Sequence, residues 1–359
     1  MQEFENRWGA AHDFFQTGAA SRSIGPECPQ ALSRESLDEF RSRHGEWTSM
    51  SIHLGGDTYT LPPAPDARLR LLVQVASDLA GKPISQLRVL DLACLEGHYA
   101  IEFALQGAEA VGIEYRAESV DKASFVKDYL HLDHLTFCQD DVRNLSREKY
   151  GEFDVVICSG ILYHLDAPDV FHFVRRILEV CTRLAIFDTH VALHAEDTVD
   201  FENQRYSGAW FQEHDESADQ ATKLKNLWAS VDNNWSFWPT PASLSNFVAR
   251  AGFSSFYECL NPYPLDADHR RAYVAIKGPK SSVLSSPKTE ALGFVERPEV
   301  LVPSVFESRR GAIVRLAKRL LPGFIRAMRR PRSTVFRDEA SVIQNAARTV
   351  PTGESQRKE

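Results

Sequence analysis

Apolar residues in the middle of the chain recur with two different spacings. Between residues 66 and 190, short continuous apolar runs alternate with longer stretches in which apolar residues return every three or four positions. The short runs are typical of buried strands, and the wider spacing is typical of helices that pack on a sheet. Their alternation predicts an α/β fold with a parallel sheet and helices on both faces.

This pattern assigns a residue range to each element. We expect strands at 88–92, 110–114, 135–139, 153–158 and 184–188, and helices at 67–79, 98–106, 119–130 and 168–181. A further helix should open after Pro239 and end near Gly252. Two short apolar runs follow at 256–260 and 272–276, and they predict two further strands.

The chain divides into three parts. Residues 1–65 form an N-terminal extension that ends in the proline-rich sequence LPPAPD, and residues 66–280 form the α/β domain. An insertion rich in Trp, Phe and Tyr interrupts this domain at about 195–240. Residues 281–359 form a linker and tail, in which 308–332 predict a basic amphipathic helix. Such a helix can contact an anionic membrane surface or a partner protein, and the alternative is a solvated or self-packed helix.

Composition narrows the classes of function. Hydrophobic residues make up 43% of the chain and charged residues 25%, which is typical of a globular protein with its own core. A net charge of −8 argues against a nucleic-acid-binding protein, because such proteins need basic surface to contact phosphates. The six scattered cysteines form no CxxC pair, and the N-terminus shows no signal peptide, so we expect a cytoplasmic protein without a zinc site.

Candidate binding residues follow the first three predicted strands. Asp91 closes the first strand in VLDLACLEGHYAIEFA, and Gly97 stands before the next helix, where backbone N–H groups can approach a ligand. Glu114 closes the second strand and can accept hydrogen bonds from two ribose hydroxyls. After the third strand, the carboxylate of Asp141 can accept from an adenine amino group, and Val142 can cover the ring.

These residues resemble the cofactor site of class I S-adenosylmethionine-dependent methyltransferases. Motif I of that family reads D/ExGxGxG, whereas this chain has DLACLEG, with Ala93 and Leu95 at the first two glycine positions. A dinucleotide pyrophosphate requires those glycines, whereas S-adenosylmethionine has no pyrophosphate, so the departure favours S-adenosylmethionine over NAD. The same departure leaves open a degenerate fold that binds nothing. The resemblance implies a Rossmann-like seven-stranded sheet, in which 256–260 and 272–276 pair as the antiparallel strands six and seven.

A second stretch, FDVVICSGILYHLDAPDVFHFVRRI at 153–177, resembles the branch that includes wobble-uridine tRNA modifiers and bacterial small-molecule methyltransferases. The resemblance covers about residues 70–190 and places Ser159 beside the cofactor, where the methyl group meets the acceptor. His164 is then the first candidate for a general base, since histidine titrates in the required range. Its alternative is a structural role in the loop.

His190 follows the fifth strand and is the second catalytic candidate, with Asp188 in place to orient it. A metal cluster of these two residues with His194 lacks a recognisable ligand pattern, so we expect no metal. The candidate acceptor-binding residues are aromatic or histidine side chains from the extension, the loop after strand four and the insertion: His53, Tyr163, Tyr206 and Trp210. Packing within an inserted subdomain is the alternative for the insertion's aromatic residues.

The sequence therefore predicts an S-adenosylmethionine-dependent methyltransferase that methylates an oxygen or nitrogen of a small organic molecule. The alternatives are a tRNA-modifying enzyme of the related branch and a non-catalytic protein with a degenerate cofactor fold. A basic face around the cleft would favour the tRNA-modifying enzyme. A failure to bind the cofactor would favour the non-catalytic protein. The acceptor and the oligomeric state are not fixed by the sequence.

Overall fold

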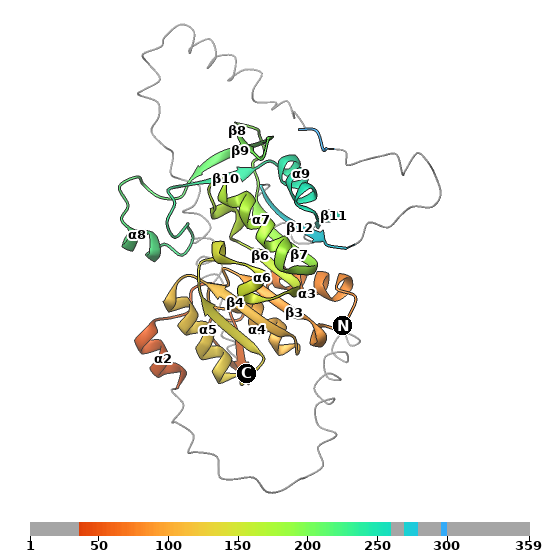
Figure 1. Ribbon diagram of the computed structural model, residues 1–359. Coiled ribbons are helices and arrows are strands. Elements are labelled where there is room, and N and C mark those ends of the chain that lie inside the picture. Colours follow the sequence, from red (N-terminus) through yellow and green to blue (C-terminus); the bar gives the residue numbers. More distant parts are fainter. Residues whose placement is uncertain (1–35, 260–268, 279–295, 300–359) are drawn as a thin grey trace, which may run out of the picture.

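A seven-stranded sheet forms the centre of the protein. The computed structural model describes residues 36–259, 269–278 and 296–299 (Figure 1). The strand order is β11-β12-β7-β6-β3-β4-β5, and β12 runs in the opposite direction to the other six strands. The strands are β3 (Arg88–Leu92), β4 (Glu109–Glu114), β5 (Leu135–Gln139), β6 (Phe153–Ser159), β7 (Cys181–His190), β11 (Ser255–Cys259) and β12 (Arg270–Ile276).

Helices connect the parallel strands and cover the sheet (Figure 1). They are α3 (Ala67–Leu79), α4 (His98–Leu105), α5 (Ala117–Tyr129), α6 (Arg147–Tyr150), α7 (Asp169–Val180) and α9 (Pro241–Ala251), with short 3-10 turns η2 (Ile84–Gln86), η3 (Val142–Asn144) and η4 (Leu162–His164). The predicted α/β fold and the positions of its strands are thus confirmed. Strand β7 is longer than the predicted 184–188, because Cys181 pairs with Phe153 at one end and His190 with Arg270 at the other.

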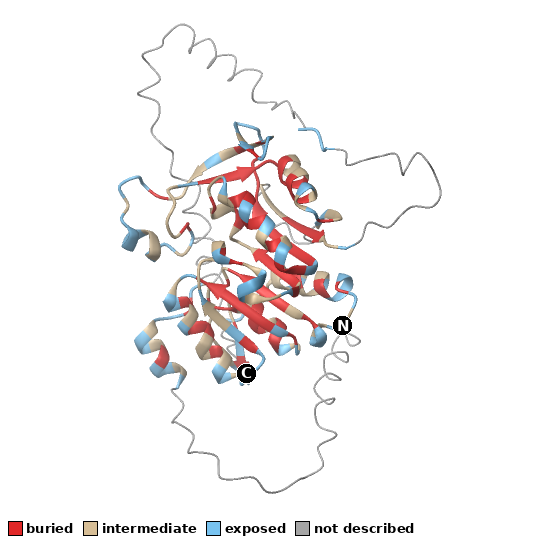
Figure 2. Ribbon diagram, in the orientation of Figure 1, coloured by how far each residue is buried: buried red, intermediate tan, exposed pale blue. Residues whose placement is uncertain are grey.

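The two faces of the sheet have separate cores. On β6, Val155 and Ile157 face the core beneath α3 and α4, whereas Val156 and Cys158 face the core beneath α7 and α9. All four side chains have no exposed surface. This alternation explains why the strand reads as one continuous apolar run, since both faces are buried. Figure 2 shows the central strands buried along most of their length.

The aromatic-rich insertion forms a second, smaller sheet. Strands β8 (Asp197–Phe201), β9 (Gln204–Gln212) and β10 (Trp235–Pro239) are antiparallel in the order β10-β9-β8, and helix α8 (Gln220–Lys225) lies between β9 and β10. Strand β10 is joined to the loop after β6 by a hydrogen bond from Phe237 N to Leu165 O of 2.9 Å. Phe171 of α7 packs on Phe201, Phe237 and Phe247, so the insertion shares the core of the central sheet.

The end of the N-terminal extension packs against the same domain. Helix α2 (Leu37–His44) and a hairpin of β1 (His53–Gly55) and β2 (Thr58–Tyr59) precede α3. Phe40 and Trp47 pack on Phe125 of α5. Residues 1–35 and the predicted basic helix at 308–332 lie outside the described residues. None of the helices in the described ranges has the length and apolar character needed to cross a membrane.

Candidate active site

The turn between β3 and α4 has the backbone conformation that glycines usually adopt, although only one of its three motif positions is a glycine. Ala93 has φ 53°, Leu95 has φ 47° and Gly97 has φ 82°, so all three motif positions lie in the left-handed region. A non-glycine residue there costs about 1–2 kcal/mol. Hydrogen bonds from Cys94 N to Ile113 O (3.0 Å) and from Leu95 N to Glu114 Oε2 (3.1 Å) hold the turn against β4.

Gly97 has a packing reason that the sequence did not reveal. A Cβ atom at this position would lie 2.5 Å from Phe137 Cζ and 2.9 Å from Ala123 Cβ. These atoms belong to β5 and α5, so the glycine lets those elements approach the start of α4. The need for glycine therefore comes from helix and strand packing, in addition to the ligand approach that the motif predicts.

Asp91 lies at the end of β3 with 2% of its surface exposed. Its Oδ2 accepts a hydrogen bond from Ala100 N at 3.1 Å, which ties the strand end to α4. Burial and the nearby charge of Glu114 together outweigh this bond and raise the pKa of Asp91 to about 8. The site thus holds a carboxyl group whose ionisation is sensitive to charge placed beside it.

Glu114 lies at the end of β4, where the sequence places the ribose ligand. It is 1% exposed, and its two oxygens accept from Leu95 N and from Arg116 N at 3.1 and 2.9 Å. A carboxylate has about four acceptor positions, so two remain for donors such as ribose hydroxyls. Asp91, the turn and Glu114 meet at one edge of the sheet, and their acceptors and backbone fit the polar part of S-adenosylmethionine.

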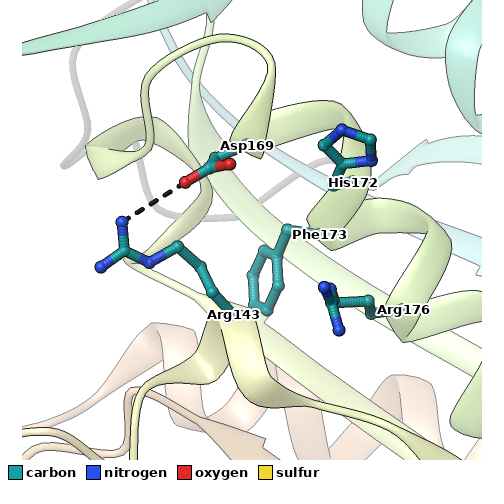
Figure 3. A pocket seen from close by; sticks show the side chains of 5 residues that line it. All are labelled: Arg143, Asp169, His172, Phe173 and Arg176. Atoms are coloured by element: carbon teal, nitrogen blue, oxygen red, sulfur yellow. Dashed lines mark hydrogen bonds and ion pairs between the residues drawn. The ribbon is translucent and has the colours of Figure 1, made fainter.

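Asp141 and Val142 follow β5 at the same edge of the sheet. Val142 is buried, while Asp141 caps the η3 turn through Arg143 N at 2.8 Å and pairs with the Arg143 guanidinium at 2.6 Å. Arg143 also pairs with Asp169 at 3.3 Å (Figure 3) and with Asp232. An adenine amino group would therefore share the Asp141 carboxylate with this arginine.

Arg143 also lines a pocket of about 150 Å³, and Figure 3 shows the side chains around it. None of its lining residues is a predicted cofactor, acceptor or catalytic residue, and the Arg143 charge is already matched by carboxylates. We assign it no ligand. Its lining residues come from η3 and α7 and are Arg143, Asp169, His172, Phe173 and Arg176.

His164 ends the η4 turn after β6 and has a carboxylate partner. Its Nδ1 lies 2.9 Å from Glu213 Oε2, and the Glu213 side chain is 1% exposed. Glu213 also accepts from Ser230 N at 3.0 Å and from Ser236 Oγ at 2.7 Å. Burial raises the pKa of Glu213, but His164 and these donors outweigh it, so the net pKa lies below its usual range. This is the arrangement of a base held by an orienting acid.

His190 lies in a different setting. Its ring stacks on Trp238 and His269 with centroids 4.9 and 4.7 Å away, and Tyr163 meets it edge-on at 4.3 Å. Burial, followed by the positive charge of Arg270, lowers the pKa of His190 to about 2. A ring that resists protonation this strongly is a poor proton acceptor near neutral pH. The geometry therefore favours His164 over His190 as the base.

Asp188 does not orient His190 by a hydrogen bond, contrary to the expectation from sequence. Its carboxylate pairs with Arg270 Nε at 2.6 Å and with Arg68 Nε at 3.1 Å. It lies opposite Ser159 in the sheet register, and Ser159 Oγ donates to Tyr99 Oη at 3.5 Å. In the described part of the chain, no three His, Cys, Asp or Glu side chains are placed to hold a metal ion.

The predicted acceptor residues do not all meet at this edge. Tyr163 contacts His164 and His190, with ring centroids 4.2 and 4.3 Å apart. Tyr206 is buried against Phe171 and Phe247, 39% of Trp210 is exposed, and His53 bonds Gly56 O within the exposed β1–β2 hairpin. The structure thus brings together Asp91, Glu114, Ser159, Tyr163 and the two histidines, and it adds Glu213, Arg116 and Arg143 to the sequence-based set.

The order of the strands and the turn after β3 define the class of protein. Residues 84–230 match the family model described as a methyltransferase domain. With the fold and the motif order, this match indicates an S-adenosylmethionine-dependent methyltransferase domain within residues 84–230.

Several named relatives share this domain. The chain is 27% identical over 124 residues to a ubiquinone biosynthesis O-methyltransferase of Acinetobacter baylyi, covering 34% of this chain and 48% of the relative. It is 26% identical over 160 residues to the enzyme of that name from Proteus mirabilis, covering 45% and 59%. The match to the first of these relatives thus spans about half of its length.

Among solved structures, the N-terminal domain of EvdMO1 with SAH and D-fucose is similar at a TM-score of 0.47 and 20% identity, covering 58% of this chain and 81% of that one. Magnesium protoporphyrin IX methyltransferase from Synechocystis with bound SAM is similar at a TM-score of 0.40 and 17% identity, covering 59% and 80%.

Proposed function

We propose that the protein transfers a methyl group from S-adenosylmethionine to a hydroxyl oxygen of a small organic molecule. The observation that carries the proposal is the His164–Glu213 pair, in which His164 lies five residues beyond Ser159 at the end of β6. A hydroxyl acceptor loses a proton on methylation, and a positioned histidine is suited to take it. The relatives are O-methyltransferases of ubiquinone biosynthesis, which supports an oxygen acceptor over nitrogen.

The proposed roles follow from the contacts of each side chain. When bound, S-adenosylmethionine supplies a methyl group already activated by its positively charged sulfur. Glu114 would accept from the ribose hydroxyls, and Asp91 and the turn after it would hold the polar end of the cofactor. Asp141 and Val142 would serve the adenine end.

Glu213 would keep the proton of His164 on Nδ1, which leaves Nε2 to take the acceptor proton. This tautomer allows His164 to act as the base while Glu213 stabilises the positive charge that forms on the ring. Tyr163 and the aromatic stack of Trp238 and His190 would form the wall that positions an organic acceptor.

The two alternatives are less well supported by this arrangement. The net charge of −8 gives little attraction to tRNA, so a nucleic-acid acceptor is not favoured. A degenerate site is not favoured either, because Ala93 and Leu95 preserve the turn in the left-handed region. We place the protein in the cytoplasm, because Cys94, Cys138, Cys158, Cys181 and Cys259, the cysteines that the structure describes, are unpaired.

Calorimetric titration with S-adenosylhomocysteine tests the cofactor assignment. We expect the wild-type protein to bind and Glu114→Gln to bind at least ten-fold more weakly, because the amide loses one acceptor oxygen and its charge. Asp200→Asn is the matched control, since Asp200 forms an exposed pair with Arg205 on the small sheet. A folded wild-type protein that binds no S-adenosylhomocysteine would overturn the assignment.

Transfer of a labelled methyl group to a panel of phenols and other small hydroxyl compounds then tests the reaction. His164→Ala should abolish transfer to any acceptor found while cofactor binding remains. Equal transfer by the wild type and this variant would remove His164 from the mechanism.

A further inference from the structure

The connection between β9 and β10 is held at both ends of the candidate site. Residues 213–232, which we call the lid, begin at Glu213, contain α8 and end at Asp232. The first lid residue holds the candidate base His164, as described above. Further lid residues contact Arg116 and Arg143 on the central domain, and each arginine stands beside a predicted cofactor ligand.

Arg116 makes three of these contacts. Its Nε donates to Leu224 O at 3.1 Å, and its Nη2 donates to Asn226 O at 2.9 Å and to Ala229 O at 3.0 Å. The side chain is 10% exposed, so the guanidinium lies between the lid and the β4–α5 loop. Arg116 also lies 3.7 Å from the Glu114 carboxylate and donates its backbone N–H to it.

Arg143 provides the second attachment. It pairs with Asp141 on the central domain and with Asp232 at the end of the lid. The lid is joined internally as well, because Ser230 N donates to Glu213 Oε2 at 3.0 Å. A movement of residues 224–232 would therefore be transmitted to the carboxylate that holds His164.

We propose that residues 213–232 form a lid that closes on the bound cofactor, and that Arg116 is the positioning residue that latches it. The proposal rests on the proposed function, because it takes Glu114 and Asp141 as cofactor ligands. The cofactor enters while the lid is open, and its contacts with Glu114 and Asp141 fix the two arginines. The closed lid then sets Glu213 against His164, so the base is oriented only after the cofactor is in place.

The chemistry of the contacts agrees with a reversible latch. Arg116 donates to backbone carbonyls, which need no particular lid side chain. Ten of the twenty lid residues are exposed and three are buried. Trp228, between two of these carbonyl groups, is 56% exposed. A segment with little buried apolar surface and a few charge-assisted hydrogen bonds is the kind that opens at low free-energy cost.

Hydrogen exchange of the full-length protein, with S-adenosylhomocysteine as the probe, tests the lid. We expect amides within 220–232 to exchange about ten-fold more slowly when the probe is bound. In Arg116→Ala this protection should be lost, and the probe should dissociate about ten-fold faster, equivalent to about 1.4 kcal/mol. Arg116→Lys should recover part of the effect, because an ammonium still donates to carbonyls.

Arg205→Ala is the matched control, because it removes the exposed ion pair between Arg205 and Asp200 on the small sheet and leaves the lid unchanged. Asp232→Asn provides a second test from the lid side and leaves the surroundings of Glu114 unchanged. Asp232→Asn should also lose the protection of the lid amides from exchange. This variant keeps the proposal testable if Arg116→Ala is too unstable to measure.

Wild-type protein that binds the probe without any change of exchange in the lid would overturn the lid proposal alone. So would Arg116→Ala or Asp232→Asn behaving like Arg205→Ala. Wild-type protein that binds no probe would overturn the cofactor assignment, and closure of the lid on the cofactor would fall with it.

Discussion

Replacing Asp91 by Asn should make the protein more stable, and increasingly so as the pH rises. The pKa of Asp91 is raised from 3.8 to about 8, first by burial and then by the charge of Glu114. A raised pKa means that the folded protein binds the Asp91 proton more tightly than the unfolded chain does. Its contribution to stability is therefore complete below about pH 4 and is lost as the pH climbs toward 8. Asn stays neutral and can still accept from Ala100 N.

The magnitude follows from linkage. Between the unfolded and folded pKa, each pH unit removes up to about 1.4 kcal/mol of stability from the wild type, because one proton is released on unfolding. The advantage of Asp91→Asn should thus widen by roughly 3 kcal/mol between pH 5.5 and 7.5. Urea unfolding, followed by tryptophan fluorescence at several pH values, measures this difference in the free energy of unfolding.

Asp154→Asn is the control with the opposite sign. Burial raises the pKa of Asp154, but Lys82 at 2.8 Å and the Arg88 N–H outweigh it, and the net pKa is lowered. Its stabilisation is present above about pH 4 and lost only at lower pH, so Asp154→Asn should be less stable than wild type by a constant amount from pH 5.5 to 7.5. A stability difference for Asp91→Asn that is equally flat over this range would refute the reasoning.

Three further substitutions have defined outcomes. Gly97→Ala should destabilise the protein by about 3 kcal/mol or more in urea unfolding, whereas Gly45→Ala, with a similar φ of 74° and no atom within 4 Å, should cost only about 1 kcal/mol. Ala93→Gly should be neutral or stabilising by up to about 1 kcal/mol in the same measurement, because φ 53° suits glycine, and a clear loss would contradict the strain. Glu213→Gln should lower kcat about a hundred-fold in a methyl-transfer assay with KM little changed, whereas an unchanged kcat would remove Glu213 from the orientation of His164.

The central sheet could be predicted because its strands are buried on both faces. Such strands appear as continuous apolar runs, and the helices between them show the wider spacing. The ends of a strand are harder to predict where pairing with neighbouring strands decides them. The ends of β7 are set by partners on β6 and β12, and the 184–188 run alone carries no information about either partner.

The small sheet was not predicted as strands, because apolar and polar residues do not alternate regularly along the sequence of β9. Its burial alternates at Tyr206, Ser207 and Gly208, which is the period of a strand with one buried face. The hairpin before it turns through Glu202 and Asn203, both at positive φ. Asn is common in such a turn, but Glu is not, so the usual sequence cue for a two-residue hairpin was missing.

Glu213 shows why the site was harder to predict than the fold. It lies 49 residues from His164, and no local spacing connects the two side chains. Its partners Ser230 and Ser236 come from the lid and β10, so the pair exists only once the small sheet has formed. A search for a carboxylate near His190 in sequence instead finds Asp188, which in the structure pairs with Arg68 and Arg270.

The turn after β3 shows that a departure from a motif does not by itself change the backbone of the turn. Ala93 and Leu95 adopt the backbone that glycine would adopt, and Leu95 N is bonded to Glu114. The turn is therefore imposed by β4 as well as by its own residues. Since Glu114 both anchors the turn and is the candidate ribose ligand, a cofactor that binds Glu114 acts directly on the shape of the turn. This coupling allows non-glycine residues at the motif positions, provided that the carboxylate is kept.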